Sequence, residues 1–369
     1  MARARELGRL GAGRTWTNPM VGAVVVKGGV SIAEAYHHRL GESHAECLAF
    51  AAAGEAARGA TLYVSLEPCA HQGHTPPCVE GILAAGIARV VIPSPDPDAR
   101  VAGLGIQRLR ERGVQVDVGC DAGAAILDNH GYYHNRLGVA RTVTLKMATS
   151  RDGMVTRARG QRDRITGDAA QLDVHRLRAV NDAIVIGVET ARIDRPRLDC
   201  RLLDAGVDRE PAVIVFDTHL SRANDAAWPA RGRQFITVCG HDVDLARARA
   251  MEARGARVLR CATRDDMVDV NDALEQLASL GFSRVLVEGG PRLMKSFIDA
   301  DAWDAFWHYQ SKEEFGSDGV SIGRSPAGHM IDELALDFDV RRRYVNVASW
   351  DSLINGLSVR EGLHVHRNR

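Results

Sequence analysis

The sequence lacks a net charge, a long apolar run and a pattern of paired cysteines. Its 369 residues contain 47 Lys and Arg against 47 Asp and Glu, so the formal net charge is zero. Nucleic-acid-binding proteins usually carry a basic surplus, and single-strand binders add aromatic residues to a basic groove. No apolar stretch is long enough to span a bilayer. We therefore expect neither a nucleic-acid partner nor a membrane partner.

The cysteines are few and irregularly spaced. The chain has seven, which is an odd number for a disulfide framework in so long a protein. The first thirteen residues, MARARELGRLGAG, are basic but contain no apolar core segment, so they do not predict a secretory signal. We expect a reducing, cytoplasmic location.

Strands and helices alternate in two successive halves. The chain is long enough for two domains. In the first half, β-branched runs such as Thr61–Leu66 alternate with helical segments such as residues 43–57. The alternation restarts at Ala140, and Ala183–Thr190 predicts a buried strand of the second half. This pattern predicts α/β domains with mostly parallel sheets covered on both faces. We place the boundary at Gly138, which gives domains over residues 1–138 and 139–369.

A histidine, a glutamate and two cysteines form a recognisable pattern between His44 and Cys78. Glu46 follows His44 by two residues, and Pro68 directly precedes Cys69. The order matches the signature of zinc-dependent deaminases, in which a histidine and two cysteines bind the metal and the glutamate does not.

The chemistry explains these residue types. Zinc binds imidazole nitrogen and thiolate sulfur, and a catalytic site keeps three protein ligands so that water can occupy the fourth position. The metal lowers the pKa of that water towards neutrality. A carboxylate outside the coordination sphere then moves protons from the attacking water to the departing amine. We predict that His44, Cys69 and Cys78 bind zinc and that Glu46 transfers the protons.

Other interpretations of the same residues stay open. Ser43 and Glu46 also fit a capping box at the start of a helix. The two cysteines could be ordinary buried apolar side chains. A structural zinc site would need a fourth protein ligand, for which His71 and His74 lie close enough in sequence.

A second candidate site follows a strand in the second half. VLVEGGPRLMKSF (Val285–Phe297) predicts a strand, a glycine turn and a helix that begins at Pro291. Free backbone N–H groups at such a helix N-terminus can hold a phosphate, although a plain strand-to-helix connection has the same pattern. Arg178 and Arg201 could clamp a phosphate bidentately. The residues alone indicate a second α/β domain with a candidate nucleotide site.

Together these residues resemble the bifunctional riboflavin-biosynthesis family, in which a pyrimidine deaminase is fused to a pyrimidine reductase. The most specific match is EPCAHQGHTPPC (Glu67–Cys78), which is narrower than the general deaminase signature. NPMVG (Asn18–Gly22) and GESHAE (Gly41–Glu46) match as well. The resemblance continues through the second half and fades after about Asp299.

The resemblance implies both a fold and a pair of reactions. The implied fold class is α/β, with an N-terminal cytidine-deaminase-like three-layer domain and a C-terminal dihydrofolate-reductase-like domain. The first implied activity is hydrolytic deamination of 2,5-diamino-6-(5-phosphoribosylamino)pyrimidin-4-one, and the second is NADPH-dependent reduction of the ribosyl group to ribityl. The implied cofactors are Zn²⁺ and NADPH. The expected partner is this small phosphoribosyl pyrimidine, and assembly into a homo-oligomer stays open.

Individual residues take their expected roles from the resemblance. The zinc ligands are His44, Cys69 and Cys78, and the proton-transfer residue is Glu46. The positions expected to contact NADP are Ala148, Arg164, Thr190, Asp194, Gly290, Pro291, Arg292, Leu293, Met294, Lys295 and Ser296. The positions expected to contact the substrate are Arg162, Arg178, Leu198, Arg201 and Glu288.

The second half departs from the family pattern. Arg164 replaces a tryptophan beside the cofactor, Arg162 replaces a small serine near the substrate, and Arg195 interrupts a usual Asp-Asp-Pro. After Trp303 the family's apolar strand gives way to FWHYQSKEEFGSDG. A deaminase whose second domain has lost or changed hydride transfer therefore stays open, whereas the neutral charge argues against a nucleic-acid base deaminase.

Overall fold

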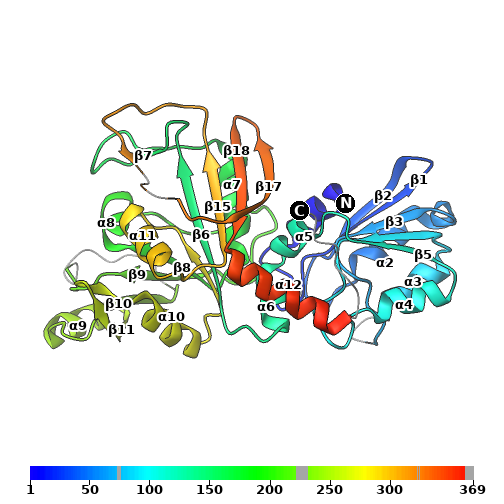
Figure 1. Cartoon of the computed structure of the whole chain (residues 1–369), viewed down its shortest axis with the longest axis horizontal. Coiled ribbons are helices and arrows are strands. Elements are labelled where there is room, and N and C mark those ends of the chain that lie inside the picture. Colours follow the sequence, from blue (N-terminus) through cyan, green and yellow to red (C-terminus); the bar gives the residue numbers. More distant parts are fainter. Residues whose placement is uncertain (73–75, 222–231, 322, 324, 362–369) are drawn as a thin grey trace. The chain divides into compact units, whose positions relative to one another are not determined.

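The computed structural model of the chain describes residues 1–72, 76–221, 232–321, 323 and 325–361 (Figure 1). The chain divides into two compact units, Met1–Val139 with the residues from Asp351 onward, and Ala140–Trp350. The boundary predicted at residue 138 lies next to this division. The predicted second domain ran to Arg369, however, whereas the residues from Asp351 onward group with the first unit.

The first unit is built on a five-stranded sheet with the order β2-β1-β3-β4-β5. β1 pairs antiparallel with β2 and β3, whereas β3, β4 and β5 are parallel. Gly28 and Gly29 form the turn between β1 and β2 with φ of 57° and 82°, a region that favours glycine. The strands are β1 (Gly22–Lys27), β2 (Val30–Tyr36), β3 (Thr61–Val64), β4 (Arg89–Ile92) and β5 (Gln115–Val118).

Helices cover both faces of this sheet. Side chains alternate along β1, so Val24 packs against Ala4 and Leu7 of α1 on one face, while Ala23 and Val25 join the core with α2, α3 and α4. The result is three layers. The helices are α1 (Ala2–Gly8), η1 (Arg9–Gly11), α2 (Ala45–Ala53), η2 (Gly54–Ala57), α3 (Cys78–Ala84), α4 (Leu104–Glu111), α5 (Ala122–Asp128) and α6 (His130–Arg136).

The C-terminal helix α12 (Val347–Glu361) completes the first unit from Asp351 onward. Leu353 and Leu357 are buried on this helix. Gly356 lies against Leu137, whose side chain would be 3.5 Å from a Cβ at that position. The helix therefore packs close to the end of α6, far from it in sequence (Figure 1).

The second unit is built on a nine-stranded sheet with the order β11-β10-β9-β8-β14-β6-β15-β18-β17. Its strands are parallel from β11 to β15, and β18 and β17 add an antiparallel edge. The strands are β6 (Thr142–Thr149), β8 (Ala183–Gly187), β9 (Ala212–Phe216), β10 (Phe235–Gly240), β11 (Arg257–Cys261), β14 (Arg284–Val287), β15 (Ala305–Gln310), β17 (His329–Leu336) and β18 (Asp339–Val345). Two short pairs lie outside the sheet: β7 (Met154–Thr156) with β16 (Val320–Ser321), and β12 (Thr263–Arg264) with β13 (Met267–Val268).

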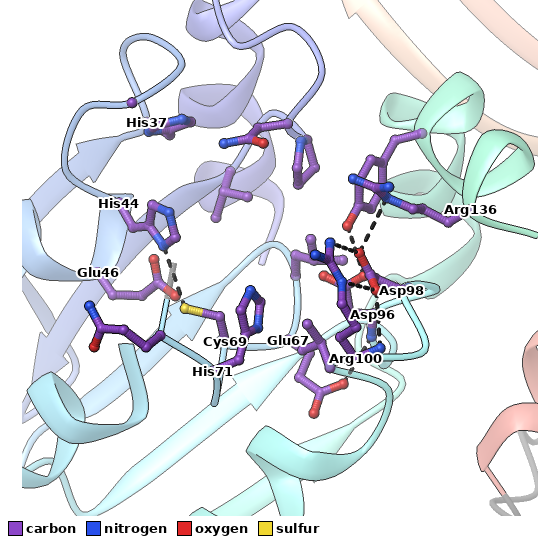
Figure 2. Close-up of a pocket in the computed structure, with 18 of the residues that line it drawn as sticks. His37, His44, Glu46, Glu67, Cys69, His71, Asp96, Asp98, Arg100 and Arg136 are labelled. Atoms are coloured by element: carbon purple, nitrogen blue, oxygen red, sulfur yellow. Dashed lines mark hydrogen bonds and ion pairs between the residues drawn. The ribbon is translucent and has the colours of Figure 1, made fainter. Parts of the chain in front are cut away.

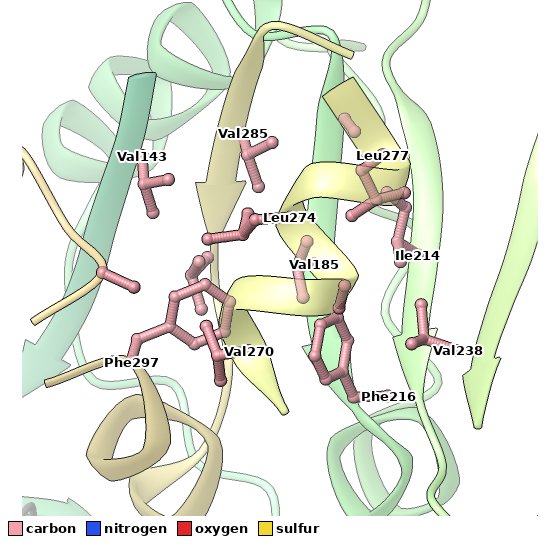
Figure 3. Packing of buried hydrophobic residues seen from close by; sticks show 14 of the residues in the cluster. Val143, Val185, Ile214, Phe216, Val238, Val270, Leu274, Leu277, Val285 and Phe297 are labelled. Atoms are coloured by element: carbon pink, nitrogen blue, oxygen red, sulfur yellow. The ribbon is translucent and has the colours of Figure 1, made fainter. Parts of the chain in front are cut away.

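Helices α10 and α11 cover one face of this sheet. Leu274 and Leu277 of α10 face Val185 and Val285 of the strands, and Phe297 of α11 closes the cluster (Figure 3). On the opposite face, Asp173 of α7 accepts a hydrogen bond of 2.8 Å from the Tyr309 hydroxyl of β15. The helices are α7 (Asp168–Ala179), α8 (Val188–Asp194), α9 (Leu245–Glu252), α10 (Val270–Ser279) and α11 (Pro291–Asp299).

Two sequence predictions in this unit are wrong. The strand predicted over Ala183–Thr190 ends at Gly187, where the buried apolar run stops and α8 begins. The segment after Trp303 was expected to lose an apolar strand, yet β15 forms there, because Phe306, Trp307 and Tyr309 are buried between β6 and β18.

None of the helices in the described residues is both long enough and apolar enough to cross a membrane.

Leu274→Ala should lower the free energy of unfolding by about 2–5 kcal/mol, because it removes a fully buried side chain between α10 and the sheet and leaves a cavity. Denaturant unfolding would measure the change. Leu245→Ala on α9 is the control, since Leu245 is 62% exposed and its loss should have almost no effect. Equal destabilisation by the two variants would contradict the packing described here.

Candidate functional site

Three elements bring His44, Cys69 and Cys78 together. His44 is the N-cap of α2, Cys69 lies in the loop after β3, and Cys78 is the first residue of α3. One nitrogen or sulfur atom of each lies within 4.8 Å of the others. Nδ1 of His44 is 3.1 Å from Sγ of Cys78 and 3.7 Å from Sγ of Cys69. The three predicted ligand atoms therefore converge on one point.

The donor set fits a zinc ion. Hydrogen bonding from the Cys78 thiol and the charge of His44 lower the pKa of Cys69 to about 4. The Cys69 sulfur in turn raises the pKa of His44 to about 9. The backbone N–H of Cys78 also donates to Sγ of Cys69 over 3.3 Å, as the free N–H groups of a helix start can do. An imidazole and two thiols, one of them favouring the thiolate, are the ligands that zinc prefers.

A third thiol lies beside this cluster. Cys47 of α2 forms a hydrogen bond with the Cys78 thiol, and this contact lowers the pKa of Cys47. The same contact, together with Cys69 and burial, raises the pKa of Cys78. The sequence motif gave Cys47 no role. Cys47 lies one helical turn after His44, and it reaches Cys78 only because α2 and α3 are neighbours in the fold.

Glu46 stands next to the cluster without belonging to it. It is the second residue of α2 and is buried, and its carboxylate contacts the Cys78 thiol. Figure 2 shows it beside His44 and Cys69. Burial raises the pKa of Glu46. The capping-box alternative is wrong, since His44 rather than Ser43 is the N-cap and no side chain caps the helix.

A cavity of about 410 Å³ is lined by His44, Glu46 and Cys69 of this site. Two histidines that line it, His37 and His71, each have one ring nitrogen without a hydrogen-bond partner among the described residues. His37 Nδ1 is 3.1 Å from the Ser43 carbonyl, while its Nε2 and the Nδ1 of His71 are buried with no hydrogen-bond partner among the described residues. Burial lowers the pKa of His37, so this ring is neutral near pH 7. His71 is not part of the three-residue cluster, and His74, the other candidate fourth ligand, lies outside the described residues.

The opposite wall of the cavity carries charged residues that the sequence reasoning missed (Figure 2). The Tyr132 hydroxyl donates to Asp96 over 2.9 Å, and burial raises the pKa of Asp96 to about 7. Asp98 forms ion pairs with Arg100 at 2.6 Å and Arg136 at 3.4 Å. Asp96 and Asp98 follow β4, the parallel neighbour of β3. The sequence could have indicated them, because parallel neighbouring strands end at the same edge of a sheet, and residues that follow β4 therefore lie near those that follow β3.

In the second unit, three of the predicted substrate positions lie close together. Arg178 of α7 binds Glu288 bidentately at 2.6 and 2.9 Å, and it also donates to the Asp199 carbonyl at 3.3 Å. Arg201 pairs with the side chain of Asp199. Lys146 of β6, which sequence reasoning missed, is 3.6 Å from Glu288. Leu198, the fourth position, is buried with φ of 51° and directly precedes Asp199.

Most of the predicted NADP positions lie on or beside α11. Gly290 is the N-cap of α11, which contains Pro291, Arg292, Leu293, Met294, Lys295 and Ser296, and the Thr190 hydroxyl would lie 3.5 Å from a Cβ at Gly290. Ala148 lies apart in sequence on β6, opposite Tyr309 of β15.

Two of the three unusual arginines have partners of their own. Arg162 donates to the Asp194 carbonyl over 3.2 Å. Arg162 is a predicted substrate position and Asp194 a predicted cofactor position, so the two kinds of position lie next to each other here. Arg164 is exposed and pairs with Asp168 at the start of α7. Arg195 ends α8 with φ of 40°.

Both halves of the chain match known family models. Residues 1–94 match the cytidine and deoxycytidylate deaminase zinc-binding region, and residues 141–321 match the RibD C-terminal domain. The chain is 39% identical to riboflavin biosynthesis protein RibD of Bacillus amyloliquefaciens over 312 residues, which cover 84% of this chain and 82% of that protein. It is 34% identical to RibD of Escherichia coli K12 over 344 residues, which cover 88% of this chain and 90% of that protein.

Solved structures agree with these matches. Acinetobacter baumannii RibD (form 1) is 29% identical, with a TM-score of 0.62 over 93% of this chain and 97% of that one. The diaminohydroxyphosphoribosylaminopyrimidine deaminase/5-amino-6-(5-phosphoribosylamino)uracil reductase of Thermotoga maritima is 29% identical, with a TM-score of 0.64 over 94% of this chain and 97% of that one. The predicted resemblance and the predicted fold class are confirmed.

Cys69→Ser and Cys78→Ser should each remove the metal, because a hydroxyl is a much poorer zinc ligand than a thiolate. Elemental analysis of the purified variants would measure the zinc content per chain. Cys120→Ser is the matched control, since Cys120 is exposed and lies outside the cluster. Full zinc occupancy in Cys69→Ser and Cys78→Ser would exclude this site.

Glu288 should make the stability of the second unit depend on acid pH. Burial alone would raise its pKa, but Arg178 and Lys146 hold that pKa at about 2, below the ordinary 4.5. A depressed carboxyl pKa stabilises the folded state above pH 4.5, and this stabilisation is lost as the pH falls from 4.5 towards 2. Unfolding measured across this range should show a smaller loss in Glu288→Gln than in the native chain, in which other carboxylates with a lowered pKa, such as Asp152, also contribute. Glu189→Gln removes an exposed carboxylate of α8 and is the control, which should behave like the native chain. If Glu288→Gln had the same pH profile as the native chain, Glu288 would not be the source of this pH dependence.

Proposed function

The chain belongs to the RibD family of riboflavin-biosynthesis proteins, with a deaminase domain and a reductase domain, and we propose that it catalyses both reactions named for its Thermotoga maritima relative. The proposed substrate is 2,5-diamino-6-(5-phosphoribosylamino)pyrimidin-4-one. Its exocyclic amine is removed by hydrolysis in the first unit, and the ribosyl group of the product is reduced to ribityl in the second.

The convergence of three zinc-type ligand atoms within 4.8 Å, beside a buried carboxylate and a cavity, is the observation that carries the deaminase proposal. His44, Cys69 and Cys78 would hold the ion. Bound there, zinc would supply a Lewis acid that makes water a nucleophile near neutral pH. A pyrimidine ring fits a cavity of about 410 Å³, which lies within the range of small-molecule sites.

Glu46 is the proposed general acid and base. It stands outside the ligand set, so its carboxylate stays free to accept a proton from the attacking water and to deliver it to the departing amine. Its burial excludes bulk water, which would otherwise compete for that proton. His37, His71 and Asp96 offer ring nitrogens and a carboxyl group for orienting the pyrimidine within the same cavity.

For the reductase we propose that NADPH binds along the start of α11 and that the substrate lies near Glu288. α11 begins with Gly290 and Pro291, and its free backbone N–H groups can hold a phosphate of the dinucleotide. Thr190 lies beside Gly290. NADPH would supply the hydride. Glu288 directly follows the carboxyl end of β14, and it forms a charged group with Arg178 and with Lys146 from the interior of β6. Ligands of parallel sheets bind at such strand ends.

Glu46→Gln should retain zinc and lose deamination by about two to four orders of magnitude, because the amide cannot transfer protons. Ammonia release from the phosphoribosyl diaminopyrimidinone would measure the loss. The same variant should still oxidise NADPH when it is given the deaminated substrate, since Glu46 belongs to the first unit. Glu55→Gln is the control for removing a carboxylate from the same region, because Glu55 is exposed in η2.

Two results would contradict the proposal. Substantial ammonia release by Glu46→Gln would refute the role of this carboxylate. Ammonia release by the native chain without any NADPH oxidation would leave only the deaminase, which is the alternative that the arginines at positions 162, 164 and 195 raise.

A further inference from the structure

Glu67 joins two segments of the first unit through its buried carboxylate. Oε2 accepts hydrogen bonds from the backbone N–H groups of Asp96 and Gly103, both at 2.9 Å. Oε1 accepts from the backbone N–H groups of Gly105 at 2.9 Å and Ile106 at 3.1 Å. One carboxylate thus satisfies four main-chain donors, and each bond is strengthened by its charge.

The two contacts of Oε2 enclose the part of the loop that lines the cavity. Asp96, Asp98, Arg100 and Val101 all line the cavity opposite the zinc-type cluster, and they all lie between Asp96 and Gly103 in the chain. Oε2 therefore closes the loop over residues 96–103 at both ends. The Glu67 side chain therefore holds both ends of this wall segment, in addition to the contacts that Asp96 and Asp98 make with Tyr132 and Arg136.

The two contacts of Oε1 fix the helix that follows. Gly105 and Ile106 belong to the first turn of α4, where backbone N–H groups lack partners within the helix and a negative charge is favourable. The fit is close, because a Cβ at Gly105 would lie 2.2 Å from the carbonyl oxygen of Pro68. The loop and α4 are thus seated directly on the chain that leads to Cys69.

We propose that Glu67 is a positioning residue of the deaminase, which fixes the cavity wall of residues 96–103 relative to the metal ligand Cys69. This inference rests on the proposed deamination. Glu67 stands two residues before Cys69. The same short segment therefore contains a predicted zinc ligand and the residue that holds the cavity wall of residues 96–103. A pyrimidine held by that wall then presents its amine-bearing carbon at a fixed distance from Cys69 and Glu46.

Glu67→Gln tests this role. An amide has only one acceptor oxygen and its NH₂ would face backbone donors, so at least two of the four hydrogen bonds are lost. We expect unchanged zinc content and a KM for the phosphoribosyl diaminopyrimidinone raised about tenfold or more, with a smaller change in kcat, since the loss of one charge-assisted bond suffices for that factor. Hydrogen–deuterium exchange should become faster in residues 94–106 and stay unchanged in α2 and α3.

Asp128→Asn is the matched control. Asp128 is a largely buried carboxylate of the same unit that binds Arg5 at 2.8 Å and does not line the cavity. Its loss should lower the Tm while KM and the exchange of residues 94–106 stay unchanged. Glu67→Asp keeps the charge but shortens the side chain, so it should raise KM by a smaller factor than Glu67→Gln. If Glu67→Gln does not fold, Glu67→Asp tests the role of Glu67 in its place.

Three results would overturn the inference. The first is that both KM and hydrogen exchange stay unchanged in the Glu67 variants. The second is that these variants lose zinc and that this loss explains their whole loss of activity. The third is that Asp128→Asn raises KM as much as the Glu67 variants do. If the native chain released no ammonia, the proposed function would fail, while the exchange measurement would still decide whether Glu67 holds the loop.

Discussion

The first unit depends on the register of β3 within its sheet. β3 runs antiparallel to β1 and parallel to β4, and this arrangement places Cys69 at the same edge as the starts of α2 and α3. Two helix N-termini and a strand end then bring an imidazole and two thiols within 4.8 Å of one another. If the register slipped by one residue, the side chains of β3 would exchange faces, and the segment before Cys69 would no longer be seated on the core.

The sequence predicted the residues that lie close together in the chain better than those that meet only through the fold. His44, Glu46, Cys69 and Cys78 form a short motif, and zinc chemistry limits which side chains can act together. Asp96 and Tyr132 were missed, because they reach the cavity from the loop after β4 and from α6, and no local pattern marks them. In the second unit, the apolar run from Ala183 predicted a strand but did not reveal that its last three residues begin α8. Tertiary pairing decided that boundary, as it decided the formation of β15.

The two units handle buried charge in different ways. In the first, the buried carboxylate of Glu67 accepts four main-chain hydrogen bonds, which fix a loop without introducing a second charge. In the second, Glu288 lies between the cations Arg178 and Lys146, directly after the end of β14.

Helix α12 makes the first unit discontinuous in the chain. Residues from Asp351 onward group with it although the whole nine-stranded sheet precedes them in the chain. Leu353 and Leu357 are buried on this helix, and Gly356 lies against Leu137. The reductase unit is in effect an insertion into the deaminase unit. A fragment cut after Val139 would therefore lack the part of α12 that belongs to this unit, although it would keep all three predicted zinc ligands.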